Sequence, residues 1–137
     1  MNNNTYLKAF IAGSAFPTIL SPMLYLGIPT ILFPQVEFSY FEHILTIAIL
    51  IGLLNVLFTK IKHTLPFGPK GRYWFFGALH GFIFTMFGNF YSHIPTELYL
   101  LERPIAFLTI PIATILYACI WRYIIRNINI MLSIENE

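Results

Sequence analysis

Residues 43–59 read HILTIAILIGLLNVLFT and contain no Asp, Glu, Lys or Arg. About 20 apolar residues cross a hydrocarbon core of about 30 Å as an α-helix, and a slightly shorter run is completed by flanking residues. The stretch does not alternate polar with apolar residues, as a half-buried strand would. Backbone polar groups find no water in lipid and must bond within the segment. The stretch therefore predicts a transmembrane α-helix.

The rest of the chain repeats this pattern. Hydrophobic residues make up 57% of the 137 residues and charged residues only 10%, against a usual charged share of about 25%. A chain of this length has too little interior to bury several such helices as a soluble core. The sequence predicts an all-α membrane protein, a single domain over 1–137. Its four expected transmembrane helices cover residues 7–28, 41–59, 73–93 and 104–125.

The charged residues predict the orientation. Lys and Arg collect on the cytoplasmic side of a membrane. With four spans, all basic residues except Arg103 fall on the side that also carries both chain ends. We therefore expect an inner-membrane protein with cytoplasmic termini. The second connection supplies the strongest orientation signal and is expected to contact anionic headgroups; its basic residues are Lys60, Lys62, Lys70 and Arg72.

The first helix is expected to be kinked. Pro17, Pro22 and Pro29 each lack an amide donor and press against the preceding turn. The segment 27–36 has three possible states: a continuation of the helix, a re-entrant segment or an interfacial one.

The C-terminal end carries a polar stripe opposite apolar residues. An amphipathic helix over 122–134 is therefore expected to follow the last span, at the inner interface or against a partner. The stripe consists of Arg122, Arg126, Asn129 and Ser133. Trp74 and Trp121 are expected in the aromatic belt at the inner boundary.

Small residues recur four apart in the second and third helices. Such residues let helix backbones approach closely, and packing drives helix association in lipid. The second and third helices are therefore expected to form a tight antiparallel hairpin. The expected packing face consists of Ala48, Gly52, Gly77, Gly81 and Gly88.

Three polar side chains within the expected spans are the main candidates for function: Asn55, His80 and Asn89. A polar group in hydrocarbon needs a partner. Asn55 and His80 are expected at similar depth, so they could bond to each other and hold the hairpin in register. The alternative is a transport role, in which His80 lines a pore or acts as a proton-linked switch.

A metal or haem site is a weaker hypothesis. His43 and His93 fall at the outer ends of the second and third helices, near Glu42 and Glu97. Two facing imidazoles could hold a haem or, with the carboxylates, a divalent metal. The alternative is that both histidines are interfacial anchors. We expect no cofactor and no metal, and the single Cys119 excludes an internal disulfide and a multi-cysteine zinc site.

The remaining chemistry indicates a protein that is not an enzyme. No expected span holds an Asp, Glu, Lys or Arg away from its ends, as a proton-driven exporter would require. Phosphate-binding loops, HExxH, EF-hand and GxSxG patterns are missing. A net charge of +2 gives no indication of a nucleic-acid partner.

Two functions remain. The first is non-catalytic contact with a membrane-protein partner or a second copy of the chain, as an immunity or exclusion factor or a small subunit of a membrane complex. The second is an oligomeric channel or small-solute transporter that uses the Asn and His groups within the membrane.

Overall fold

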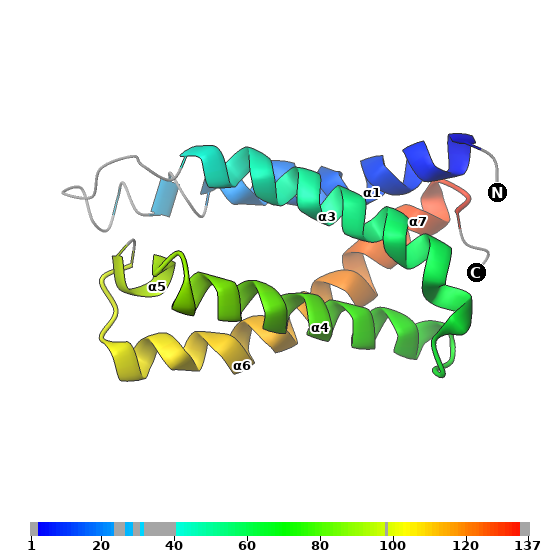
Figure 1. Cartoon of the computed structure of the whole chain (residues 1–137). Helices are drawn as coiled ribbons and strands as arrows, with labels where there is room; N and C mark the ends of the chain where they lie inside the picture. The colour runs from blue at the N-terminus through cyan, green and yellow to red at the C-terminus, as the bar shows by residue number, and fades with distance from the viewer. Residues whose placement is uncertain (1–2, 24–26, 29–30, 32–40, 98, 135–137) are drawn as a thin grey trace. The chain divides into compact units, whose positions relative to one another are not determined.

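The computed structural model describes residues 3–23, 27–28, 31, 41–97 and 99–134 (Figure 1). These residues form helices joined by turns, and no strand occurs among them, so the all-α prediction is confirmed. The chain divides into two compact units: residues 1–65 with 124–137, and residues 66–123.

The first unit is built on two long helices and a short C-terminal one. The helices are α1 (Asn3–Pro22), α3 (Phe41–Ile61) with the 3-10 turn η2 (Lys62–Thr64), and α7 (Arg126–Met131). α1 packs against α3 in the antiparallel sense, since Ala9 lies beside Asn55 and Gly13 lies beside Ile51. The two helices can approach this closely because Gly13 has no side chain. A Cβ added to Gly13 would lie 2.6 Å from the Ile51 carbonyl oxygen.

The second unit is a helical hairpin. It contains α4 (Pro69–Phe90), the single turn α5 (Ile94–Glu97) and α6 (Arg103–Cys119). α4 begins four residues before the expected start at residue 73, because Pro69 occupies the first helical turn after Gly68 at the N-cap. Proline is well suited there, since its missing amide would have no helical acceptor.

The last helix does not stop at the end of the expected span. α6 continues through a π-helical segment, η3 (Ile120–Ile125), into α7. The expected extension over 122–134 is therefore helical as far as Met131. Two helices, Thr46–Thr64 and Arg103–Met131, are long and apolar enough to cross a membrane.

The expected packing of the second helix on the third needs correction. The small-residue face of α3 is filled by α1: a Cβ on Gly52 would lie 2.7 Å from the Phe10 ring. The small-residue face of α4 is filled by α6 through Gly77 and Gly81. The two faces are therefore not each other's partners.

The kink of the first helix and the state of the segment after it both stay predictions. Pro17 and Pro22 lie within α1, but the kink itself remains a prediction. Of the segment 27–36, the structure describes only residues 27, 28 and 31.

Candidate functional site

Asn55 lies at the centre of a buried amide cluster in the first unit. Its Nδ2 donates to the Ala9 carbonyl at 2.7 Å and to Asn129 Oδ1 at 2.9 Å, and Asn129 Nδ2 donates back to Asn55 Oδ1 at 3.1 Å. Both side chains are fully buried. The reciprocal bonds join α3 to α7 and to the backbone of α1, so Asn55 holds three helices together. The proposed bond from Asn55 to His80 is replaced by this cluster.

His80 is buried in the second unit among aromatic rings. Trp121 Nε1 donates to His80 Nδ1 at 3.0 Å, and the rings of Phe84 and Tyr117 approach His80 edge to face at 4.6 and 4.8 Å between centroids. Because Nδ1 is the acceptor, the imidazole hydrogen resides on Nε2. That Nε2 is buried and finds no hydrogen-bond partner among the residues that the structure describes.

Asn89 lies near the other end of the same hairpin. Its Nδ2 donates to the Thr85 carbonyl at 2.9 Å and to Thr109 Oγ1 at 3.0 Å, so this amide also links α4 with α6. All three polar side chains singled out by the sequence are thus bonded within their own unit.

Most residues of the predicted packing face are buried against a neighbouring helix of their own unit, and one is not. Ala48 is buried on α3, and a Cβ on Gly81 would lie 2.8 Å from the Ala113 carbonyl oxygen and from Tyr117 Cβ. Gly88 is different, because no atom of the described residues lies within 4 Å of an added Cβ. Its place in the packing face therefore stays a prediction, although the neighbouring Asn89 bonds to Thr109 of α6.

The basic residues of the second connection belong to both units. In the first unit, Lys60 lies in the last turn of α3 and Lys62 begins the 3-10 turn η2. In the second unit, Lys70 and Arg72 lie in the first turn of α4. Lys60 and Lys70 are exposed, whereas Lys62 is buried. Their contact with anionic headgroups stays a prediction.

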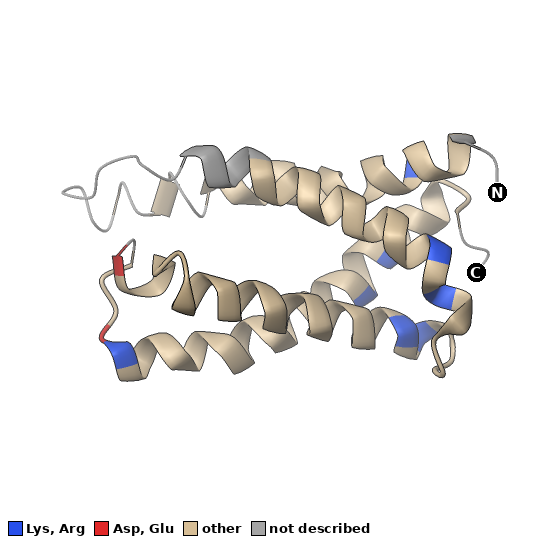
Figure 2. Cartoon of the chain, in the orientation of Figure 1, with Lys and Arg blue, Asp and Glu red and all other residues tan. Residues whose placement is uncertain are grey.

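Within the second unit the charges are separated along the hairpin (Figure 2). Because α4 and α6 are antiparallel, Lys70 and Arg72 lie at the same end as Arg122. Glu97 and Arg103 lie at the opposite end. The 22 residues of α4 separate these ends by roughly 33 Å, about the thickness of a hydrocarbon core.

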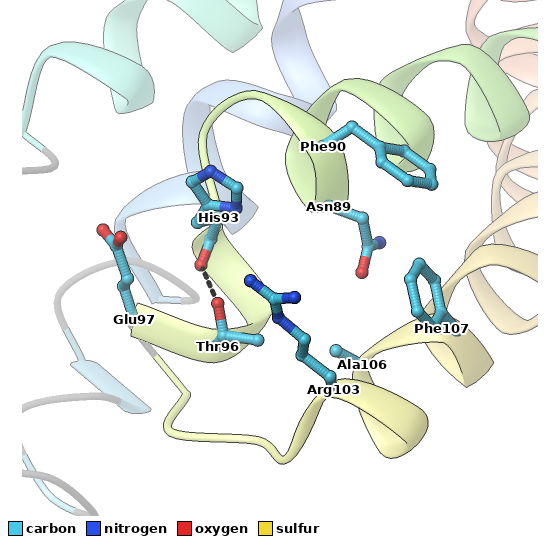
Figure 3. A pocket seen from close by; sticks show the side chains of 8 residues that line it. All are labelled: Asn89, Phe90, His93, Thr96, Glu97, Arg103, Ala106 and Phe107. Atoms are coloured by element: carbon cyan, nitrogen blue, oxygen red, sulfur yellow. Dashed lines mark hydrogen bonds between the residues drawn. The ribbon is translucent and has the colours of Figure 1, made fainter.

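A cavity of about 440 Å³ opens at the end of the hairpin that carries Glu97 and Arg103 (Figure 3). It lies between the end of α4, α5 and the start of α6. Eight residues line it: Asn89, Phe90, His93, Thr96, Glu97, Arg103, Ala106 and Phe107. The sequence singles out Asn89, His93 and Glu97 for separate reasons and does not indicate that they surround one space.

The histidine pair remains without support from the described residues. The side chain of His43 is not among them, whereas His93 lines the cavity. No group of three or more His, Cys, Asp or Glu side chains that could hold a metal ion occurs in the described part of the chain.

Three contributors to these clusters were missed or misplaced. Trp121 was expected in an interfacial belt and Asn129 on a polar outer stripe, yet both are fully buried. Gly13 was missed altogether, although Ala9 and Gly13 show the same four-residue spacing that singled out the other packing faces.

Comparison of the chain with protein-family models, with curated proteins and with solved structures gives no match.

Proposed function

We propose that the chain is a four-span inner-membrane protein with both termini in the cytoplasm, and that it acts without catalysis, through helix contacts with a membrane-protein partner. Two observations support the membrane location. Two helices are long and apolar enough to cross a membrane, and large apolar side chains lie on the surface while polar ones are buried, the reverse of a water-soluble protein. On α3, Leu53 and Leu57 are about half exposed while Asn55 is fully buried. Large apolar groups outside and amides inside suit lipid as the surrounding solvent.

One observation favours partner contacts over transport: the polar side chains available for a pathway are already used for packing. The amides of Asn55 and Asn89 bond to groups of neighbouring helices, and His80 Nδ1 accepts from Trp121. A permeation pathway needs polar groups that face water or substrate. These groups instead stabilise the helix pairs.

The outward face of α6 is the best candidate for the contact surface. Four of its exposed apolar residues recur at spacings of three and four along one side of the helix: Ile105, Leu108, Ile112 and Ile115. Between 48% and 64% of each of these residues is exposed. A heptad-like apolar stripe is the pattern with which helices pack against one another.

Site-specific photocrosslinking in native membranes tests this proposal. A photoreactive phenylalanine analogue replaces Ile112 on the stripe or, as a control on the same helix, Thr114 on another side. We expect one crosslinked product of defined mass from position 112 and none from 114. An identical pattern from both positions, or no product from any stripe residue, contradicts the proposal.

Transport is tested separately with the purified chain in liposomes. The partner proposal predicts no solute or ion flux above that of empty liposomes. Flux that is lost in Asn55→Ala and His80→Ala but kept in Gly88→Ala would overturn it in favour of the channel. Gly88 is a suitable control because an added Cβ meets no neighbour there.

A further inference from the structure

The cavity at the end of the second unit is lined by two side chains of opposite charge. Arg103 at the start of α6 directs its guanidinium toward the middle of the space (Figure 3). Glu97 at the end of α5 supplies a carboxylate on the rim. A planar guanidinium binds phosphate through paired N–H donors, and a carboxylate accepts from an ammonium group. This charge pair is complementary to a compact zwitterion.

Asn89 adds an oriented acceptor. Its Nδ2 is held by Thr85 and Thr109, so the carboxamide cannot turn freely. Its Oδ1 faces the space beside Arg103 (Figure 3). The cavity therefore presents an oxygen that accepts a hydrogen from a bound N–H or O–H group.

Aromatic rings form the remaining wall. Phe90 and Phe107 lie with their ring centroids 5.7 Å apart and are about half exposed. They continue the apolar outer surface of α4 and α6. A ligand whose charged head enters the cavity would thus have an apolar path for its tail along this surface.

We propose that this cavity binds the headgroup of a phosphatidylethanolamine lipid. Arg103 holds the phosphate, the Glu97 carboxylate on the rim accepts from the ammonium, and the acyl chains leave along Phe90 and Phe107. The inference rests on the membrane location given under the proposed function. A choline headgroup has no N–H to donate, and a glycerol headgroup has no positive charge for Glu97, so the site distinguishes ethanolamine from both.

Native mass spectrometry of the delipidated chain in a nonionic detergent tests the inference. The probes are dihexanoyl forms of phosphatidylethanolamine, phosphatidylcholine and phosphatidylglycerol, and tail-free glycerophosphoethanolamine. We expect one ethanolamine lipid per chain, bound about tenfold more tightly than the other two lipids, a difference typical of one charge-assisted hydrogen bond. Tail-free glycerophosphoethanolamine bound as tightly as the lipid would overturn the lipid assignment.

Variants assign the two charges separately. Arg103→Gln is expected to lower the affinity for all three lipids about tenfold. Arg103→Lys should have an intermediate affinity, because it keeps the charge but loses the paired donors. Glu97→Gln should lower the affinity for the ethanolamine lipid alone, so that the chain no longer prefers this lipid to the other two. Arg122→Gln, at the far end of the hairpin, and Glu102→Gln, which does not line the cavity, are the matched controls and should bind like the unchanged chain.

Equal losses in the controls, or an unchanged preference in Glu97→Gln, would overturn the inference. Circular dichroism of each variant verifies that the helices are intact. Carbonate extraction of native membranes tests the membrane location independently of the lipid site. A chain released by carbonate contradicts the membrane location, whereas a chain that stays in the membrane but lacks the ethanolamine preference contradicts the lipid site alone.

Discussion

At the scale of single residues, the buried amides of Asn55 and Asn129 determine how the helices of the first unit are joined. Each carboxamide donates to the other, and Asn55 also donates to the Ala9 carbonyl. In a low-dielectric interior a satisfied amide pair stabilises one register, while a single remaining amide is costly. The pair therefore contributes more to selecting one register of the helices than to the total stability of the fold.

A double-mutant cycle measures this coupling. Asn55→Leu or Asn129→Leu alone is expected to lower the free energy of unfolding by on the order of 1–3 kcal/mol, because each leaves the other amide buried without its partner. The double variant should cost less than the two single losses together. Unfolding is followed by circular dichroism as dodecyl sulfate is added to detergent micelles.

Asn127→Leu is the control on the same short helix, because Asn127 is exposed. It should leave unfolding nearly unchanged. Strictly additive losses from positions 55 and 129 would show that the two amides do not act as a pair.

At the scale of helices, glycine sets how closely two backbones approach. A Cβ on Gly77 would lie 2.7 Å from Trp121 Cβ and from the Tyr117 carbonyl oxygen, so α4 and α6 are nearly in backbone contact there. This close approach also brings Trp121 within hydrogen-bonding distance of His80. The glycine face and the buried polar bond therefore depend on each other.

Gly77→Ala tests this dependence. We expect it to force the helices apart and to lower the free energy of unfolding by about 1–3 kcal/mol, the usual cost of overpacking. Gly88→Ala on the same helix should be neutral or slightly stabilising, since nothing opposes its Cβ and alanine favours helix. Unfolding in detergent, followed by circular dichroism, compares the two. Equal effects at both positions would contradict the packing of α4 on α6 at Gly77.

At the scale of the whole molecule, the two sets of connections differ in charge. The connection between α3 and α4 is basic. The one between α4 and α6 contains Glu97 and Glu102 and is followed by Arg103, the first residue of α6. With the proposed four spans, these connections lie on opposite sides of the bilayer.

Labelling of introduced cysteines with a membrane-impermeant maleimide tests the proposed topology. In a Cys119→Ser background, Tyr91→Cys should react in intact spheroplasts and Thr64→Cys only after lysis. Both positions are exposed in the structure, so access to the reagent depends on the membrane alone. Labelling of both residues from the same side would contradict the four-span arrangement.

The sequence by itself determined that the chain is helical and approximately where its helices lie. Long uncharged runs and the charges that flank them are local features, so they predict helices without knowledge of which helices pack together. The end of the third expected span agrees with Phe90 to within three residues, and its start shifted only because Pro69 begins the helix.

Only the tertiary structure decided which helices pair. Three small-residue faces share a spacing of four residues, so the sequence does not indicate which of them pack together. They contain Ala9 and Gly13, Ala48 and Gly52, and Gly77 and Gly81. For the same reason the partners of Asn55 and His80 could not be found from the sequence: Asn129 and Trp121 are 74 and 41 residues away. Burial and hydrogen bonding between distant segments depend on how the backbones approach one another, and that approach exists only in the folded chain.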